Sequence, residues 1–296
     1  MQSPDTQAAK PFQIMTNNIY PCLWFDGLAK SAATFYCGFF PDARITTDTP
    51  MVVNFELFGK KIMGLNGGPV FKINPSISFF VYCHSEEEAA FFWQQLSREG
   101  NILLPFEDYP WSEKYGWVAD QFGVSWQVMY SEEQAARHRI VPSMLFSGEQ
   151  YGHAYEAIEF YTQVFPKSYI RSANFYEAED RQPEGNLALA YFSLHNTDFT
   201  AMDGGGRHQF AFNEGVSLVV NCENQDEIDH YWQQLSAGGS ECNCGWLKDR
   251  FGVSWQIVPQ QLGSLVNHPQ HGKAVGQALM QMKKIDLTQL NAIAGH

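Results

Sequence analysis

The chain has 296 residues, of which 45% are hydrophobic, 15% aromatic and only 17% charged, so it can bury the cores of two globular domains. Its formal net charge of -13 repels a phosphate backbone, and no stripe rich in Lys or Arg offsets that charge, which excludes nucleic acid as a partner. The first fifteen residues lack the basic start and apolar core of a leader segment, and no window approaches eighteen consecutive apolar residues, so we expect a cytoplasmic protein with no membrane partner.

The first predicted element is a strand at 19–25, followed by a helix in which small and aromatic residues recur at helical spacing up to Pro41. Apolar residues then alternate over 51–57 and return over 62–65 after the Gly59-Lys60 turn, which predicts a β-hairpin. The chain therefore opens with a strand, a helix and further strands.

The same order starts again with a strand at 77–83, after which Ser85 and Glu88 form a capping box that opens an amphipathic helix. Closing strands are predicted at 116–119 and 124–129, on either side of a turn. The first half of the chain thus contains two βαβββ-like modules.

The segment 104–111, which precedes the closing strands, is rich in aromatic and acidic residues and has no counterpart of equal length in the second half. Insertions concentrate where the backbone is exposed, so we expect either a lid over a pocket or an elaborated loop that packs on the other copy. If it is a lid, Glu107 and Asp108 are candidates for a general base, because burial raises the pKa of a carboxylate.

The second half of the chain repeats the first. The string Phe122-Gly123-Val124-Ser125-Trp126-Gln127 returns unchanged as Phe251-Gly252-Val253-Ser254-Trp255-Gln256, and Trp93-Gln94-Gln95-Leu96-Ser97 returns as Trp232-Gln233-Gln234-Leu235-Ser236. Two tandem copies with four modules are therefore predicted. The expected segments are an N-terminal tail at 1–15, a first domain at 16–131, a linker at 132–139, a second domain at 140–261 and a C-terminal helical tail at 262–296.

The six cysteines do not form a disulfide framework. Cys22, Cys83 and Cys222 lie in predicted strands and Cys37 in a predicted helix, whereas Cys242 and its neighbour two residues on make a single Cys-x-Cys pair. We expect reduced thiols.

Several blocks resemble the PhnB-like family of the vicinal oxygen chelate superfamily, which includes glyoxalase I, bleomycin-resistance proteins and extradiol dioxygenases. The blocks are Tyr20-Pro21-Cys22-Leu23-Trp24-Phe25-Asp26-Gly27, Phe35-Tyr36, Met63-Gly64-Leu65-Asn66-Gly67-Gly68, Asp120-Gln121-Phe122-Gly123, Asp203-Gly204-Gly205 and Gly245-Trp246-Leu247-Lys248-Asp249-Arg250. Sequences of this kind are commonly labelled 3-demethylubiquinone-9 3-methyltransferase.

The resemblance implies an α+β glyoxalase/bleomycin-resistance-like fold, in which paired βαβββ modules form a cup-shaped sheet with helices outside and a small-molecule pocket inside. Family members with one copy tend to dimerise, so the resemblance also implies an intrachain pseudo-dimer of the two copies and leaves a homodimer of the whole chain open. Methyltransferase activity is not expected, because the clusters at Gly67 and Gly204 follow hairpin strands and are typical of turns.

Metal-dependent relatives place a His on the first strand and a Glu on the last strand of each module. The corresponding positions here are Tyr20 or Pro21, Met63 or Gly64, Ser78, Gln127, Val141 or Pro142, Ala201, Ser217 and Gln256. None of them is His, Asp or Glu, the residues that hold a divalent cation through nitrogen or oxygen. We therefore expect neither a metal ion nor another cofactor.

Without a metal ion, a pocket relies on shape, aromatic rings and a few polar groups. The leading candidates for ligand contacts are Gln127 and Gln256, because an amide donates and accepts hydrogen bonds at once. Further candidates are Trp24, Asn66, Ser78, Trp111, Asp203 and Ser217. Trp126 and Trp255 are expected on the opposite face of their strands, beneath a helix.

Three functions remain open at this stage. The first is a metal-independent small-molecule binding protein. The second is a metal-dependent lyase, isomerase or oxygenase with a displaced metal site. The third is an interaction surface in which one cup is filled by side chains. No Ser-His-Asp or Cys-His arrangement is evident, so the catalytic residues stay unknown.

Overall fold

The computed structural model describes residues 19–137, 139–180, 182–205 and 208–295, so the predicted N-terminal tail at 1–15 lies outside the described residues. Within these ranges no helix has the length and apolar character needed to span a bilayer. All six cysteines are free thiols, as predicted.

Four modules follow one another, each with a strand, a helix and three further strands. The first is β1 (Ile19–Phe25), α1 (Ala29–Cys37), β2 (Arg44–Asp48), β3 (Val52–Leu57) and β4 (Lys60–Asn66), and the second is β5 (Ile77–Cys83), α2 (Glu86–Ser97), β6 (Asn101–Tyr109), β7 (Ser112–Ala119) and β8 (Ser125–Tyr130). The third is β9 (Ile140–Phe146), η1 (Gly148–Gln150), α4 (Ala154–Val164), β10 (Tyr169–Phe175), β11 (Leu187–Leu194) and β12 (Thr197–Asp203), and the fourth is β13 (Val216–Cys222), α5 (Gln225–Ser236), β14 (Ser240–Glu241), β15 (Trp246–Lys248) and β16 (Ser254–Pro259). The predicted order of four βαβββ modules is confirmed.

The strands form two mixed sheets, and each sheet combines one module from each copy. Sheet A has the order β14-β15-β16-β13-β1-β4-β3-β2, and sheet B has the order β10-β11-β12-β9-β5-β8-β7-β6. The first and fourth modules meet where β1 pairs antiparallel with β13, and the second and third meet where β5 pairs antiparallel with β9. The two copies therefore form a pseudo-dimer through continuous backbone hydrogen bonding.

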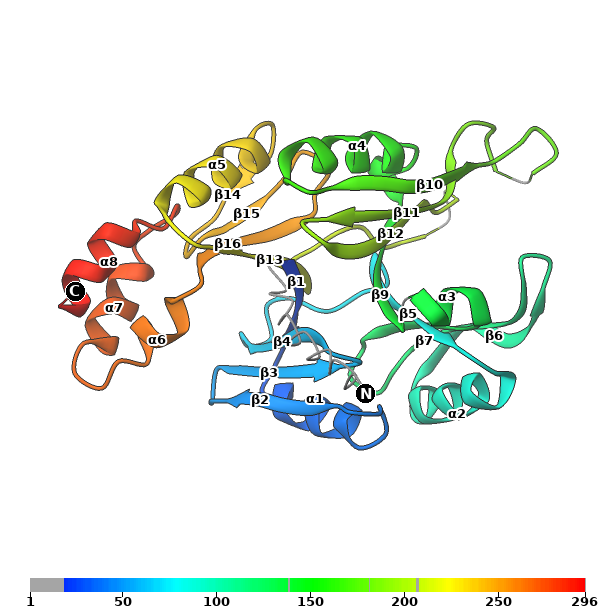
Figure 1. Ribbon diagram of the computed structural model, residues 1–296, viewed down its shortest axis with the longest axis horizontal. Helices are drawn as coiled ribbons and strands as arrows, with labels where there is room; N and C mark the ends of the chain where they lie inside the picture. Colours follow the sequence, from blue (N-terminus) through cyan, green and yellow to red (C-terminus); the bar gives the residue numbers. More distant parts are fainter. Residues whose placement is uncertain (1–18, 138, 181, 206–207, 296) are drawn as a thin grey trace, which may run out of the picture.

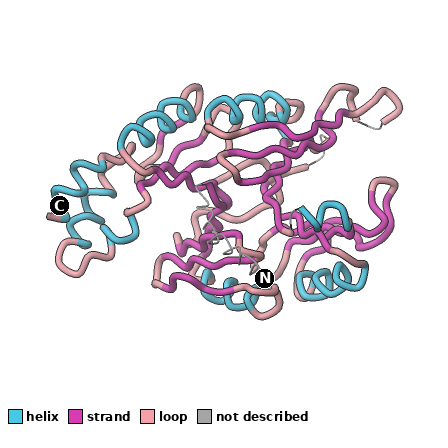
Figure 2. Tube along the Cα trace, in the orientation of Figure 1, coloured by secondary structure: helices cyan, strands magenta, loops and turns pink. Residues whose placement is uncertain are grey.

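The helices lie on the outside of this arrangement (Figure 1). Helices α1 and α2 of the first copy lie along one side of the molecule, α4 and α5 of the second copy lie along the other, and the two sheets run between them. Figure 2 shows the same layering, with strands in the middle and helices at the periphery. Each sheet therefore has one face covered by helices and one face free of these four helices, which we call the inner face.

A buried carboxylate in the repeated string holds each copy together. Asp120 accepts hydrogen bonds from Tyr36 Oη of α1 at 2.6 Å and from Trp126 Nε1 at 2.8 Å, and its other oxygen accepts from the backbone N–H groups of Phe122 and Val124 at 2.8 and 3.0 Å. Trp126 is fully buried on the helix-covered face, as predicted. The first module is thereby tied to the closing turn of the second.

The second copy repeats this bond set. Asp249 accepts from Tyr161 Oη at 2.7 Å, from Trp255 Nε1 at 2.8 Å and from two backbone N–H groups at 2.9 and 3.0 Å. Burial raises the pKa of Asp249 to about 6, because desolvation of the charged form outweighs these four bonds. The repeated sequence thus encodes the contact between modules of one copy.

The predicted cap of α2 is present, and the second copy has an equivalent one at α5. Ser85 Oγ accepts from the backbone N–H of Glu88 at 3.2 Å, and the Glu88 side chain accepts from the backbone N–H of His84 at 2.7 Å. In the second copy Asn224 accepts from the backbone N–H of Glu227 at 3.0 Å. These bonds satisfy amides at the helix N-termini that have no partner within the helix.

The segment 104–111 differs from the expected loop, because most of it belongs to β6 and forms a hairpin with β7. The ring of Phe106 stacks on Trp93 of α2 in the same module, with centroids 5.4 Å apart. Packing against its own helix therefore draws the segment into sheet B.

The linker and the C-terminal tail contain the remaining helices. The linker forms α3 (Glu132–Arg137), and the tail forms α6 (Leu262–Val266), α7 (Gly272–Leu279) and α8 (Leu287–Ala294). The tail docks on sheet A near β15, where the backbone N–H groups of Cys244 and Gly245 donate to the carbonyl oxygens of Met282 and Lys283.

Candidate functional site

The inner face of each sheet carries four side chains at equivalent places near its centre. On sheet A, Cys22 of β1 lies in register with Met63 of β4 and with Ser217 of β13. Gln256 Nε2 of β16 donates to Ser217 Oγ at 2.9 Å. We call Cys22, Met63, Ser217 and Gln256 quartet A.

The corresponding set on sheet B is quartet B. Ser143 of β9 lies in register with Thr200 of β12 and with Ser78 of β5, and Gln127 Nε2 of β8 donates to Ser78 Oγ at 2.7 Å. The structure therefore brings together the predicted contacts Gln127 and Ser78 on sheet B, as it does Gln256 and Ser217 on sheet A.

The registers separate the alternatives that the resemblance left open on three strands. Tyr20 shares the inner face of β1 with Cys22, and Val141 shares that of β9 with Ser143, whereas Pro21 and Pro142 point to the opposite face. On β12 the inner-face residue is Thr200 and not Ala201. Strands β1 and β9 are buried on both faces, so alternation in the sequence does not fix which residue stands at the centre.

The chemistry of the quartets does not fit a divalent cation held by nitrogen and oxygen ligands. Their side chains are hydroxyls, amides, a thiol and a thioether, whereas such cations take His, Asp and Glu. Burial raises the pKa of Cys22 to about 12, because desolvation disfavours the thiolate form. Over the ranges that the structure describes, no three His, Cys, Asp or Glu side chains gather as a metal site.

The two glutamines differ in how far the protein satisfies them. Gln127 Oε1 accepts from Tyr115 Oη at 2.6 Å, so both ends of this amide are bonded. For Gln256 the bond to Ser217 uses the amide nitrogen, and no side chain in the described part of the chain donates a hydrogen bond to its oxygen. Sheet A therefore keeps a hydrogen-bond acceptor on its inner face.

Indole rings flank quartet A. Trp24 and Trp246 are half-buried, and their ring centroids lie 5.9 Å apart. Trp24 Nε1 donates to the carbonyl oxygen of Gly68 at 2.7 Å, and the ring lies so close to Gly67 that a Cβ there would be 2.1 Å from it. Trp24 can take this position only because residue 67 has no side chain.

The inner face of sheet B is covered by the linker. Ala135 of α3 packs on a cluster that contains Phe80, Tyr82 and Val141. Figure 1 shows α3 lying between the strands of the second and third modules. The hydroxyls of Ser143 and Thr200 are buried and form no hydrogen bond with described residues. All four members of quartet B are buried, whereas Met63 of quartet A and the flanking Trp24 and Trp246 are half-buried.

Asn66 and Asp203 occupy equivalent places at the ends of β4 and β12, where they cap helices. Asn66 Oδ1 accepts from the backbone N–H of Ala29 at 3.0 Å. Asp203 accepts from the backbone N–H groups of Gly152, Ala154 and Leu187 at 2.8, 3.2 and 2.8 Å. Burial raises the pKa of Asp203, and these three bonds oppose the rise. Backbone contacts therefore occupy both carboxylate oxygens.

Trp111 lies away from both quartets, at the turn between β6 and β7, and 62% of its surface is exposed. Its ring stacks on Tyr109 with centroids 4.9 Å apart. Trp111 therefore belongs to neither quartet.

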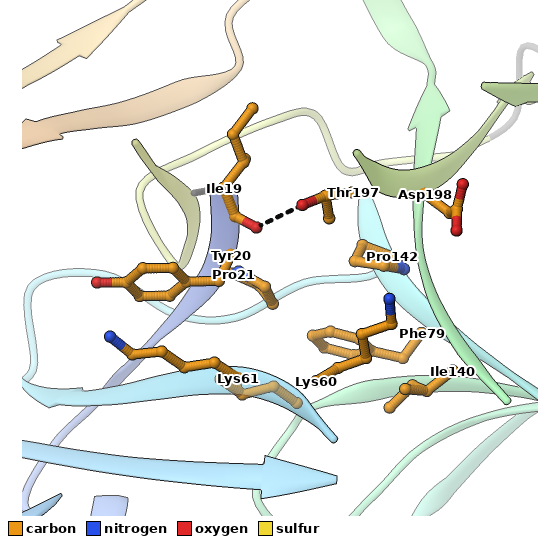
Figure 3. A pocket seen from close by; sticks show the side chains of 11 residues that line it. Ile19, Tyr20, Pro21, Lys60, Lys61, Phe79, Ile140, Pro142, Thr197 and Asp198 are labelled. Atoms are coloured by element: carbon orange, nitrogen blue, oxygen red, sulfur yellow. Dashed lines mark hydrogen bonds between the residues drawn. The ribbon is translucent and has the colours of Figure 1, made fainter. Parts of the chain in front are cut away.

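A small recess lies where the two copies meet (Figure 3). Its lining includes Tyr20, Lys61, Pro142 and Asp198, and Thr197 Oγ1 donates across it to the carbonyl oxygen of Ile19 at 3.1 Å. Its volume is about 20 Å³, which accommodates a water molecule and no organic ligand. We regard it as part of the joint between the copies.

Sequence reasoning missed Cys22, Ser143, Thr200 and Trp246 as inner-face residues. Trp246 carried a signal, because it stands in a block that resembles the family and lies in register with Gln256. The other three lie in strands whose inner register is set by partners distant in the sequence.

Comparison with known proteins bears on both copies. The family model described as 3-demethylubiquinone-9 3-methyltransferase matches residues 17–129 and 138–258. A putative 3-demethylubiquinone-9 3-methyltransferase, PhnB protein, from Bacillus cereus is 31% identical over 38% of this chain and 98% of its own, with a TM-score of 0.36. Among curated proteins none matches the chain.

A glyoxalase I variant from Zea mays is similar over a longer stretch. It is 12% identical and covers 81% of this chain and 92% of its own, with a TM-score of 0.50. At this identity the likeness concerns the fold alone. It agrees with the glyoxalase-like architecture expected from the sequence, and the family match agrees with the resemblance in both halves.

Proposed function

The chain belongs to the family described as 3-demethylubiquinone-9 3-methyltransferase. We propose that it binds a small organic molecule without the help of a metal ion. The observation that carries the proposal is the composition of the quartets, in which a Gln and a Ser form a buried hydrogen-bonded pair on each sheet. Neutral donors and acceptors of this kind orient an organic ligand.

The inner face of sheet A is the proposed binding face. Gln256 offers an acceptor that the described residues leave unsatisfied, and Trp24 and Trp246 offer apolar ring surface beside it. Ser217 orients the amide, and Met63 adds a flexible apolar contact. A flat molecule with one hydrogen-bond donor matches this combination.

Gln127 and Ser78 are the equivalent contacts proposed for sheet B. In the structure Tyr115 already bonds Gln127, and α3 covers the neighbouring aromatic cluster. A ligand reaches this face only after α3 moves, so we propose that the two faces differ in competence and that sheet A binds first.

Methyl transfer is not the proposed activity, although the family description names it. A nucleotide-derived methyl donor binds where a Gly-rich turn leads from a strand into a helix of a parallel sheet. Here Gly68 follows β4, Gly204 follows β12, and both lead into loops. Neither turn therefore has the strand-to-helix setting of such a cofactor site.

A metal-dependent lyase, isomerase or oxygenase is the second candidate. It needs a cation held away from both quartets, since their side chains do not suit one. Measurement of metal content separates this candidate from the first.

Binding is tested with 2-naphthol, a flat neutral molecule with one hydroxyl donor, and with naphthalene as the matched compound that lacks the donor. Calorimetric titration is expected to show a preference for 2-naphthol that the variant Gln256→Leu weakens by roughly 2- to 10-fold, the effect of one hydrogen bond. The matched variant Gln127→Leu should leave the affinity unchanged. Equal affinities for wild type, Gln256→Leu and Trp246→Ala would contradict the assignment to sheet A.

A further inference from the structure

The tip of the β6–β7 hairpin forms a recess that lies outside both quartets. Its lining consists of Glu86, Asp108, Tyr109, Pro110, Trp111, Ser112 and Glu113, and it measures about 600 Å³ with a wide opening to solvent. Figure 1 shows this hairpin extending beyond the other strands of its module. The equivalent strands of the fourth module, β14 and β15, are much shorter, so its described residues form no hairpin of this length.

An aromatic surface forms one wall of the recess. The Trp111 ring stacks on Tyr109, and Tyr109 packs edge-on against Tyr115 with centroids 5.7 Å apart. Tyr109 Oη also donates to the carbonyl oxygen of Pro105 at 3.0 Å, which fixes its ring. One side of the indole therefore rests on a held ring, while 62% of the Trp111 surface remains exposed.

Carboxylates surround this ring surface. Glu86, Asp108 and Glu113 line the recess, and Glu107 precedes Asp108 on β6. Lys114 places a cation here: its Nζ lies 2.7 Å from Asp108 Oδ1. The hydrogen bond to Asp108, together with the charges of Asp108, Glu86 and Glu107, raises the pKa of Lys114. The recess therefore favours positive charge, and one ammonium group leaves most of the negative charge uncompensated.

From this juxtaposition we propose that the recess binds a small organic cation of the quaternary ammonium class, with its charged group over the Trp111 ring. A cation over an indole is attracted by the negative face of the ring, and nearby carboxylates add to that attraction. A metal ion is less suited, because these carboxylates do not converge into a group of three ligands within the described residues.

This site is independent of the ligand proposed for sheet A, since Trp24 and Gln256 belong to the other sheet. The aromatic contacts do connect it with quartet B, because Tyr115 touches Tyr109 and also donates to Gln127. The recess thus lies at the outer end of a row of rings that leads to the closed inner face.

The test uses benzyltrimethylammonium as the probe and neopentylbenzene, which has the same shape without the charge, as its matched control. Titration is followed by calorimetry and by the indole N–H signals in NMR spectra. We expect the cation to bind and to shift one indole signal, the one missing in Trp111→Ala. That variant should bind roughly 2- to 5-fold more weakly, as expected for loss of an exposed cation–π contact.

Charge is tested with the double variant Glu86→Gln/Glu113→Gln, which should also weaken binding, and with Glu179→Gln, an exposed carboxylate elsewhere, which should not. Low salt should strengthen binding, because screening is reduced. Any of three results would overturn the proposal. The neutral control binds as tightly as the cation, the cation shows no measurable binding at low salt, or Trp111→Ala binds the cation as tightly as the wild type. Binding of an oligo-arginine peptide without the small cation would instead assign the recess to a protein partner. Gln256→Leu should bind the cation normally, so failure here is distinguishable from failure at sheet A.

Discussion

The buried carboxylate of Asp249 gives a prediction in which the sign and the size both follow from the structure. Its pKa is raised by burial from 3.8 to about 6. A group whose pKa is higher in the folded than in the unfolded state stabilises the fold when it is protonated, and this contribution is lost as the pH rises through the folded-state pKa. Because of this pKa difference, the free energy of unfolding should be about 3 kcal/mol higher well below pH 4 than well above pH 6.

The perturbation is Asp249→Asn, which removes the titration and keeps the shape of the side chain. At pH 7.5 the variant should lose about 1 to 3 kcal/mol, because an amide nitrogen cannot accept the bond from Trp255 Nε1. As the pH falls from 7.5 to 4.5, the free energy of unfolding of the wild type should rise relative to that of the variant.

The assay is urea unfolding of both proteins at several pH values, with Asp226→Asn, which changes an exposed carboxylate on α5, as the control. For this control, the difference in free energy of unfolding from the wild type should not grow as the pH falls. If the difference in free energy of unfolding between wild type and Asp249→Asn stays constant or narrows at low pH, the pKa of Asp249 is not raised. The four hydrogen bonds would then keep the carboxylate ionised in the folded protein.

Two further predictions concern the inner faces. Gln127→Leu should lower the free energy of unfolding by about 1 to 3 kcal/mol, because it leaves two buried hydroxyls without their partner. Gln256→Leu should lower it less, since it breaks one such bond. Urea unfolding measures both losses, and an equal or larger loss for Gln256→Leu would contradict the difference between the faces. Gly67→Ala should displace the Trp24 ring and lower the free energy of unfolding by about 1 to 3 kcal/mol. The indole NMR signal of Trp24 should change and the unfolding midpoint should fall. An unchanged signal would contradict the close contact.

Much of the local structure was predictable from the sequence. The strands Ile19–Phe25 and Ile77–Cys83 have the predicted bounds, because each is a compact apolar run with clear breaks at both ends. The caps at Ser85 and Asn224 follow from side-chain chemistry over three residues, which local sequence contains in full. The repeat of the Asp120 turn indicated duplication, although its role as a buried link between modules did not follow from the pattern.

The assembly of the modules was not predictable in this way. Cys22 faces Ser217 across a strand pair that joins the two ends of the chain, and no periodicity records such a pairing. The same holds for Ser143, whose register depends on its partner Ser78. Ala135 packs α3 on the aromatic cluster of sheet B, and one apolar residue in a polar segment does not predict such a contact.

The proposed contacts show the same division. Gln127 with Ser78, and Gln256 with Ser217, could be chosen because a polar residue in an apolar strand stands out in the sequence. Asp203 stands out equally, but its partners are backbone amides of a helix start far along the chain. A polar side chain at a strand end therefore does not reveal by itself whether it contacts a ligand or caps a helix.

The neutral chemistry of the two quartets underlies the proposed metal-independent binding. The direct measurement is the metal content of the purified full-length protein by elemental analysis, combined with unfolding midpoints before and after treatment with a chelator. We predict less than a stoichiometric amount of any transition metal and an unchanged midpoint. One tightly held Zn, Ni, Mn or Fe ion per chain, whose removal lowers the midpoint, would contradict the account.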